Sequence, residues 1–194
     1  MKNPFDCFAK QNITRVTAEL VNAQGVWNSQ FVSNYYNALE AGIPEFHAIV
    51  RVNDSFVPLK LCQNISYNLP ENFNGTTWLY MNKTNWNRGT SQSLPYLLNL
   101  TWTCQAYLWN TGIYSDAKDW TEIMGDRTKG QSILRLLPLW YISGNKVIAF
   151  DDFDVAGFGG WTNPSMKEYV GKTYFCGTFV EGLEYYEKVL SITS

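Results

Sequence analysis

The pentapeptide Trp78–Asn82 combines a strand pattern with polar groups at a place suited to chemistry. The pattern predicts a buried strand over Thr76–Met81, with Tyr80 and Asn82 at its carboxyl end. In a barrel of parallel strands, sites for chemistry lie at the carboxyl ends of the strands. A phenol and an amide can bind a ligand there through hydrogen bonds, but an amide cannot donate a proton as a general acid does.

Carboxylates occur later in the chain. Asp151, Asp152 and Asp154 form a cluster, and Glu181 stands in a late strand pattern. The cluster lacks the glycine and the distal glutamate of a calcium loop, so capping or a solvated loop is the favoured interpretation. His47, the single histidine, lies within an apolar strand and is interpreted as a hydrogen-bonded core residue. We expect neither a metal site nor a cofactor.

Two features favour a secretory compartment. The four cysteines are widely spaced and include no Cys-x-x-Cys pair, so disulfides are a better interpretation than zinc, and three pairings are formally possible. Asn-x-Ser/Thr triplets are glycosylation acceptors in secreted chains. They occur at Asn12, Asn53, Asn64, Asn74, Asn82 and Asn99. We therefore expect a secreted or extracellular protein, or one in a lysosomal or phagosomal lumen.

The first residues do not fit that compartment. Met1–Asp6 contains no apolar targeting segment, so we expect that residues precede Met1 in the full protein. The alternative is a cytosolic protein with accidental triplets and free thiols.

Composition and charge exclude several classes of partner. The 194 residues are 45% hydrophobic, which is enough for one large core, and we expect a single domain over residues 1–194. The net charge is −2, and no run of Lys and Arg is present, so nucleic acid is not an expected partner. No apolar stretch reaches the roughly 18 residues that a membrane span needs.

Apolar positions switch between periods of two and 3.6 in the first two thirds of the chain, which predicts alternating strands and helices. Strands are expected over Ile13–Leu20, Phe46–Val52, Thr76–Met81 and Gly112–Ser115. Helices are expected after an Asn28 cap through Leu39, from Leu94 to Leu108, and after an Asp116 cap through Met124. The segment Asn53–Asn74 is expected to be a long polar loop.

The last third lacks helical patterns. Leu137–Ile142, Met166–Val170 and Thr178–Leu183 are expected strands, joined by loops rich in glycine and aromatic residues. Alternation that ends in bare strands predicts an α/β fold, a modified TIM-like (β/α) barrel with an irregular last third.

Several short motifs between Gly112 and Glu181 resemble those of a known protein family. They are Gly112–Ser115, Asp119–Trp120, Leu139–Trp140, Phe150–Phe153, Phe158–Pro164, Lys167–Tyr169, Cys176–Gly177 and Val180–Glu181. Together they resemble the glycoside hydrolase family 25 lysozymes, in the forms of nematodes and protists. The resemblance runs from about Phe5 onward and is loose before Thr76.

The resemblance implies a barrel of eight strands and five helices that cleaves bacterial cell-wall glycan. It also implies acids at strand ends: an Asp on the first strand, an Asp-x-Glu on the fourth and an Asp on the last. Tyr80 falls on the Asp of the pair, Asn82 on its Glu, and Glu181 on the last Asp. The first Asp has no counterpart, because the chain starts at what looks like the first helix, with Cys7 in it. The first strand is therefore expected to be missing from this chain.

The same resemblance gives binding residues and a disulfide pairing. Tyr114 and Trp140 match cleft positions at strand ends, where they could stack on sugars or simply pack. The expected ligand-binding set is Tyr80, Asn82, Tyr114, Trp140 and Glu181. Cys7 is expected to pair with Cys176, joining the chain ends of a closed barrel, and Cys62 with Cys104 on neighbouring crossovers.

These expectations predict a secreted, glycosylated, lysozyme-like protein that has lost hydrolysis and acts as a glycan-binding or extracellular structural component. Its partner would be peptidoglycan or a chitin-like glycan. One alternative is an active muramidase with displaced acids, with Glu181 and Asp152 as candidates. Another is an assembly subunit of an extracellular polymer, whose open sheet edge accepts a strand from a neighbouring subunit.

Overall fold

Seven strands form one curled sheet in the order β1-β2-β3-β4-β5-β6-β9. Strands β1 to β6 are parallel, and β9 runs antiparallel to β6. The strands are β1 (Arg15–Val21), β2 (Glu45–Arg51), β3 (Thr76–Tyr80), β4 (Asn110–Ser115), β5 (Leu139–Ile142), β6 (Met166–Val170) and β9 (Leu183–Tyr185). A separate hairpin consists of β7 (Thr173–Phe175) and β8 (Thr178–Val180). The computed structural model describes residues 4–108, 110–126, 133–153, 157–170, 173–180 and 183–185.

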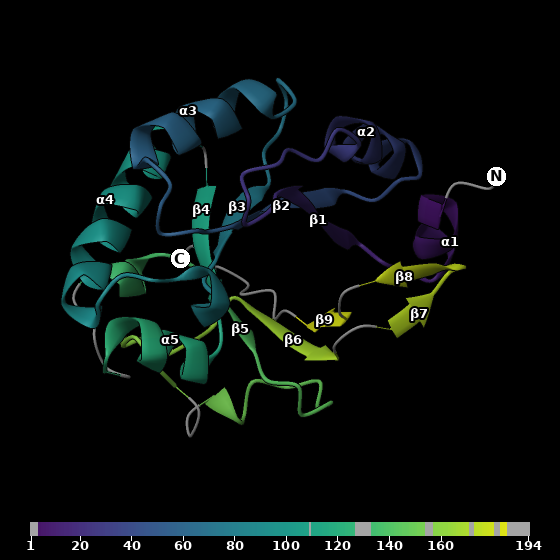
Figure 1. Cartoon of the computed structure of the whole chain (residues 1–194). Helices are drawn as coiled ribbons and strands as arrows, with labels where there is room; N and C mark the ends of the chain where they lie inside the picture. Colours follow the sequence, from purple (N-terminus) through teal and green to yellow (C-terminus); the bar gives the residue numbers. More distant parts are fainter. Residues whose placement is uncertain are drawn as a thin grey trace, which may run out of the picture.

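Helices cover the outside of the curl. They are α1 (Pro4–Lys10), α2 (Phe31–Glu40), α3 (Pro58–Asn68), α4 (Thr90–Tyr107) and α5 (Ala117–Met124), with short 3₁₀ turns at Lys83–Asn85 and Leu134–Leu136. Figure 1 shows α2 to α5 outside the sheet, whereas loops follow β5 and β6. None of the helices described here is both long and apolar enough to cross a bilayer. The expected α/β fold with five helices is therefore present in these residues.

Local sequence explains where the expected helices begin and end. Helix α2 buries Phe31, Tyr35 and Ala38, which lie on one face, and the chain leaves it at Gly42 with φ of 85°. Helix α5 starts after Asp116, whose carboxylate accepts a 2.7 Å hydrogen bond from the backbone N–H of Asp119. The expected Asn28 cap is wrong by two residues, since the cap position of α2 is Gln30.

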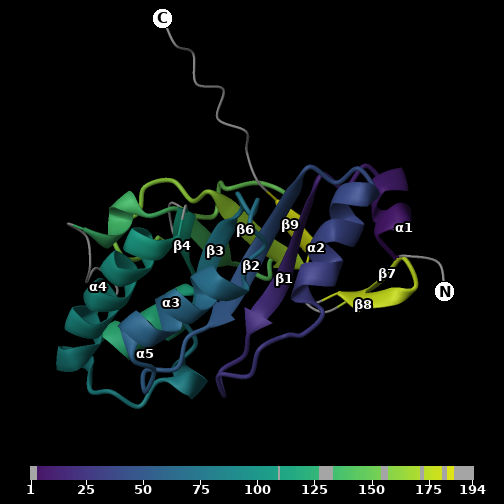
Figure 2. The ribbon, with the colours of Figure 1, turned by 90° about the horizontal axis from the view of Figure 1, so that it is seen from above.

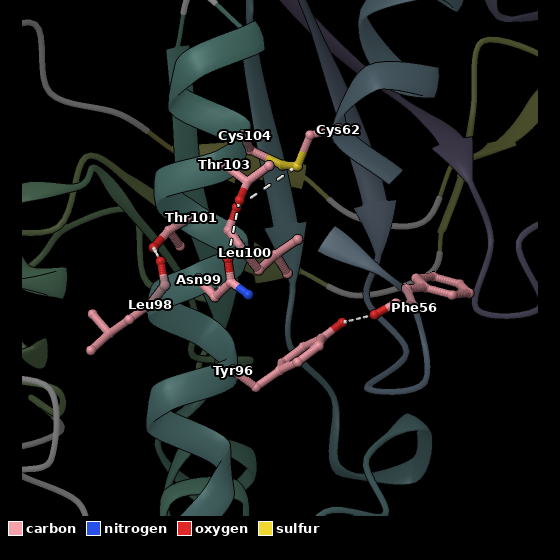
Figure 3. Close-up of a disulfide and its surroundings, with 9 residues drawn as sticks. All are labelled: Phe56, Cys62, Tyr96, Leu98, Asn99, Leu100, Thr101, Thr103 and Cys104. Carbon is pink, nitrogen blue, oxygen red and sulfur yellow. Dashed lines mark hydrogen bonds between the residues drawn. A yellow bond between two sulfur atoms is a disulfide. The ribbon is translucent and has the colours of Figure 1, made fainter. Parts of the chain in front are cut away.

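The expected long loop over Asn53–Asn74 is wrong, because it contains α3. Pro58 stands in the first turn, where its missing N–H costs no helical hydrogen bond. Leu61, Cys62 and Ile65 form the buried stripe, and Cys62 is bonded to Cys104 of α4 (Figure 3). The stripe is short and interrupted by polar residues, so its period is hard to recognise in the sequence.

The end of the sheet also differs from expectation. The expected strand Thr178–Leu183 is divided between β8 and β9, and β7 was not anticipated. The eight-stranded barrel is not what the described residues form: they make an open, curled sheet of seven strands with β1 and β9 at its edges.

Two apolar clusters lie on opposite faces of this sheet. The larger fills the space between the sheet and the helices. The smaller lies inside the curl and consists of Trp78, Tyr114, Trp140 and Met166. Gly112 pairs with Trp78 across β3 and β4, and a Cβ at Gly112 would lie 2.4 Å from the indole ring. Only glycine leaves room for Trp78 inside the curl.

Both expected disulfides are confirmed. Cys7–Cys176 joins α1, which precedes edge strand β1, to the β7–β8 turn, which precedes edge strand β9. Figures 1 and 2 both show α1 beside this hairpin. The rings of Phe8 and Phe175 stack next to the bridge with centroids 5.8 Å apart. The bridge therefore ties the two edge regions of the open sheet together.

Mild reduction is expected to break the two disulfides in order. Cys62 and Cys104 are fully buried, whereas Cys7 and Cys176 are half-buried. A thiol reductant should therefore reduce the Cys7–Cys176 bridge before the Cys62–Cys104 bridge. Loss of the Cys7–Cys176 bridge, which spans 169 residues, should lower the free energy of unfolding by about 4 kcal/mol. Differential alkylation with mass spectrometry, followed by urea unfolding, measures both effects. Simultaneous reduction of the two bridges in the native protein would contradict this order.

Candidate functional site

The candidate site lies inside the curl, at the carboxyl ends of the parallel strands. Alternate residues of each strand face this side, because successive side chains of a strand point to opposite faces. They include Ile49, Trp78, Tyr80, Tyr114, Trp140, Ile142 and Met166. We call their outer rim, at the carboxyl ends of the strands, the mouth of the sheet.

Four planar groups form a continuous row across the mouth. The guanidinium carbon of Arg51 lies 5.0 Å from the ring centroid of Tyr80. The Tyr80 and Tyr114 rings stack at 4.5 Å, and those of Tyr114 and Trp140 at 3.9 Å. Each member pairs with the next in the register of β2, β3, β4 and β5. We call this set the planar row.

The planar row changes what Tyr114 and Trp140 can offer a ligand. Trp140 is 2% exposed and Tyr114 is 8% exposed, and each covers a face of the other. In this packing they form a wall of the site and present no open platform for a sugar ring. Tyr80 is half-buried and is the least buried aromatic member of the row.

Asn82 uses its whole amide within the protein. Its Oδ1 accepts hydrogen bonds from the backbone N–H and the hydroxyl of Thr84, which caps the turn that follows. Its Nδ2 donates to Asp119 Oδ2 at 2.8 Å and to Tyr80 Oη at 3.3 Å. Asn82 therefore joins the segment after β3 to the first turn of α5.

Asp119 brings a carboxyl group to the mouth. It stands in the first turn of α5, is half-buried, and also accepts a 3.2 Å hydrogen bond from the backbone N–H of Lys83. Burial raises the pKa of Asp119, and the neighbouring carboxylate of Asp116 raises it further. Asp119 is thus an acidic group beside Asn82, although it belongs to α5 and not to the segment that follows β3.

Two more carboxylates complete the rim. Glu168 on β6 accepts a hydrogen bond from the Tyr114 hydroxyl, and Glu19 on β1 forms an ion pair with Arg51. Burial raises the pKa of the Tyr80 phenol, an effect that Asn82 and Arg51 oppose and that Asp119 and Glu168 reinforce. Tyr80 therefore keeps its proton at neutral pH and can donate a hydrogen bond to a ligand.

Asp152 lies on the other face of the sheet. It accepts hydrogen bonds from Tyr141, from Ser143 at 2.6 Å and from Lys167 at 2.7 Å. Tyr141 and Lys167 alternate with the inward-facing residues of β5 and β6, so this network is separated from the mouth by the sheet. Burial alone would raise the pKa of Asp152, but these hydrogen bonds lower it to about 2. An ionised carboxylate on the outer face cannot protonate a sugar bound at the mouth.

Other expected site residues are accounted for as follows. Glu181 and Asp154 lie outside the described residues. His47 is a hydrogen-bonded core residue, as its sequence context indicated: its Nδ1 accepts a 2.8 Å bond from the Thr76 N–H. Burial, reinforced by Arg15, lowers the pKa of His47 to about 4. Within the described part of the chain, no cluster of three potential metal ligands occurs.

The six glycosylation triplets fall into two groups. Asn12, Asn64, Asn74 and Asn99 are exposed. Asn53 and Asn82 are half-buried, and their amide nitrogens donate hydrogen bonds within the protein, from Asn53 to the carbonyl of Ala23 at 3.1 Å. The exposed group is therefore accessible to modification, whereas the other two would lose internal contacts.

The sequence interpretation missed Asp119, Glu168, Arg51 and Glu19. Three of the four had a detectable signal. Asp119 follows the Asp116 cap by three residues, which places it in the first helical turn after a strand. Glu168 stands two residues after Met166, on the same face of β6. Arg51 ends the apolar run of β2, where a charged side chain can reach only the rim.

The chain is similar in sequence to several known proteins. The family profile described as lysozyme-like protein 1 matches residues 1–169. Probable GH family 25 lysozyme 4 of Dictyostelium discoideum is 33% identical over 103 residues, covering 53% of this chain and 46% of that protein. Counting factor 50 of the same organism is 28% identical over 190 residues, covering 94% of this chain and 60% of that protein. The chain thus spans roughly half the length of these relatives.

Solved structures show the same fold at low identity. The muramidase from Acremonium alcalophilum superposes with a TM-score of 0.71 at 13% identity, covering 97% of this chain and 89% of that chain. The modular autolysin LytC from Streptococcus pneumoniae, solved with a synthetic peptidoglycan ligand, gives a TM-score of 0.64 at 13% identity, covering 92% of this chain and 41% of that chain.

Replacement of Asp152 by Asn should make the free energy of unfolding less dependent on pH in the acid range. The folded-state pKa of Asp152 lies below its ordinary value of 3.8, so its charge stabilises the fold above about pH 4 and loses that effect as pH falls towards 2. The contribution of the Asp152 charge to the free energy of unfolding is on the order of 2 kcal/mol. Urea unfolding of both proteins from pH 6 to pH 2 should show their stability difference narrowing by that amount. A constant difference across this range would contradict the role given to Asp152.

Proposed function

The chain belongs to the lysozyme-like protein 1 family, and on that premise we propose that it is a secreted protein that binds N-acetylated glycan at the mouth of its sheet without cleaving it. Relatives named as family 25 lysozymes support the choice of glycan as the ligand. Peptidoglycan is the first candidate, because a structural relative was solved with a peptidoglycan ligand. A chitin-like glycan shares the N-acetylglucosamine units of peptidoglycan but not its N-acetylmuramic acid.

One observation carries the lack of cleavage: the amide of Asn82 occupies the position where the resemblance requires a carboxylic acid. Its nitrogen and oxygen are both engaged by protein partners, and an amide has no proton to transfer to a leaving oxygen. Loss of a positioned general acid typically lowers a rate by about 10² to 10⁴. Tyr80, at the neighbouring acid position, is held in the planar row.

The same region retains groups that suit binding. The Tyr80 hydroxyl can donate a hydrogen bond, and the Asp119 carboxylate can accept one from a sugar hydroxyl. Both side chains are half-buried at the mouth, so each has solvent-facing surface. A weak hydrogen-bonding site on an aromatic wall is a common way to hold a neutral sugar.

Secretion is part of the proposal. Two disulfides stabilise the fold, which favours an oxidising compartment. Four exposed glycosylation triplets are consistent with the same route.

Binding without hydrolysis is directly measurable. The purified protein should leave bacterial cell walls intact in a turbidity assay in which an active muramidase clears them, and should bind peptidoglycan fragments by calorimetry. Tyr80→Ala should weaken binding by about two- to tenfold, since aromatic contacts contribute roughly 0.5–1.5 kcal/mol. Tyr67→Ala, at a tyrosine that is 83% exposed on α3, is the matched control and should bind normally. Wall clearing at the rate of the active muramidase would reject the proposal.

A second candidate function is a muramidase in which Asp119 supplies the proton. The position of its carboxyl, 2.8 Å from the Asn82 amide, favours this alternative, as does its raised pKa. A carboxyl group that holds its proton to higher pH is the form that a general acid needs.

Asp119→Asn separates the two functions. If the protein only binds glycan, the wild type and the Asp119→Asn variant should both show only background clearing of cell walls. If Asp119 is the acid, the wild type clears walls and the variant loses about 10² to 10⁴ in rate. Glu71→Gln, at an exposed residue before β3, is the control for loss of a surface carboxylate. We expect no difference in clearing between the three proteins.

A further inference from the structure

A hollow of about 610 Å³ lies outside the sheet, between residues 55–58 and the first half of α4. Its lining combines apolar and polar groups, among them Ser55, Phe56, Arg88, Gln92, Tyr96 and Asn99. This volume is within the range of roughly 300–1,000 Å³ that is typical of small-ligand sites. None of the groups at the mouth takes part in it.

The walls of the hollow are held in place by partly buried polar contacts. The Arg88 guanidinium donates two hydrogen bonds to the backbone carbonyl of Asp54, at 2.8 and 3.0 Å, and lies 4.4 Å from the Tyr96 ring centroid. The Tyr96 hydroxyl donates to the carbonyl of Phe56 at 3.0 Å (Figure 3). The Asp54 carboxylate, 4% exposed, accepts a 2.6 Å hydrogen bond from the Asn87 N–H. The hollow is therefore preformed.

Helix α4 adds hydrogen-bond acceptors to this hollow. Pro95 lies inside the helix and has no N–H, so the carbonyl of Ser91 lacks its usual helical donor four residues on. Ser91 and Pro95 both line the hollow. The partly exposed Phe56 ring, the amides of Gln92 and Asn99, and a carbonyl acceptor together match the mixed surface of an N-acetylated sugar.

Asn99, which lines this hollow, is a potential attachment site for an N-linked glycan. It begins the triplet Asn99-Leu100-Thr101, is exposed, and lines the hollow. Its Oδ1 accepts a 3.2 Å hydrogen bond from the Thr103 hydroxyl, and its Nδ2 makes no hydrogen bond to the described part of the protein. Figure 3 shows Asn99 and Tyr96 on the same side of α4, with the Asn99 nitrogen directed towards the segment of Phe56.

We propose that Asn99 carries an N-linked glycan whose first sugars are seated in this hollow. In the transfer step, the amide nitrogen forms a bond to C1 of an N-acetylated sugar donated by a polyprenyl-diphosphate oligosaccharide. The bond from C1 to the diphosphate oxygen breaks, the diphosphate leaves with the bonding electron pair, and one amide proton is lost. The seated glycan covers Phe56 and the Arg88–Tyr96 pair.

Asn64 provides an internal comparison. It is exposed on α3 and begins a triplet of the same kind, but it is not part of the lining. A glycan there would extend into solvent. The proposal requires passage through the secretory pathway and is independent of whether the mouth binds or cleaves glycan.

The test compares release of the two glycans from the native full chain, secreted from a eukaryotic host. Glycopeptide mass spectrometry first measures occupancy, and an endoglycosidase that cuts within the glycan core is then applied. Release at Asn99 should be about tenfold slower than at Asn64. This ratio corresponds to a free energy of about 1.4 kcal/mol for binding of the glycan in the hollow. After denaturation and alkylation, the two rates should be equal.

Two variants check that the lining causes the protection. Phe56→Ala removes the apolar wall while keeping the backbone carbonyl that Tyr96 contacts, and Gln92→Ala changes an exposed residue that does not support the fold. Each should speed release at Asn99 and leave Asn64 unchanged. An unmodified Asn99, or equal native release at the two sites, would overturn the proposal.

Discussion

The register of four parallel strands is the constraint on which the candidate site depends. Neighbouring strands lie about 4.8 Å apart, and a flat side chain at the same level of each strand must therefore stack on the next. Arg51, Tyr80, Tyr114 and Trp140 occupy that level, with separations of 3.9 to 5.0 Å. Beneath them, Gly112 leaves the space that Trp78 fills. A shift of one residue in any of these strands would turn its member of the row to the outer face.

The planar row and the hydrogen bonds of Asn82 form an internally satisfied surface at the two positions where the family resemblance implies an acid pair. Acidic groups remain nearby, but on other elements: Asp119 on α5 and Glu168 on β6. Their positions explain why the absence of carboxylates at Tyr80 and Asn82 does not make the mouth apolar. The distinction between a binding site and a catalytic one therefore depends on whether Asp119 can reach a substrate from beside Asn82.

Much of the fold could be predicted from local signals. Buried strands such as Phe46–Val52 and the Asp116 cap have strong patterns, and both disulfide pairs followed from the expected barrel. Helix α3 could not be recognised, because its apolar stripe is short and partly formed by a cysteine. The outward position of Asp152 was equally hidden, since it depends on Lys167, a charged residue buried on the far face of β6. Such contacts between distant segments have no period in the sequence.

The Cys7–Cys176 bridge has a topological consequence. It encloses residues 7–176 in one covalent ring, which contains strands β1 to β7 and helices α2 to α5. A protease that cuts any single peptide bond within this ring converts it into a linear chain, but the two pieces stay linked through sulfur. Nicked molecules would thus keep their segments at a high effective concentration and could continue to function in surroundings rich in proteases.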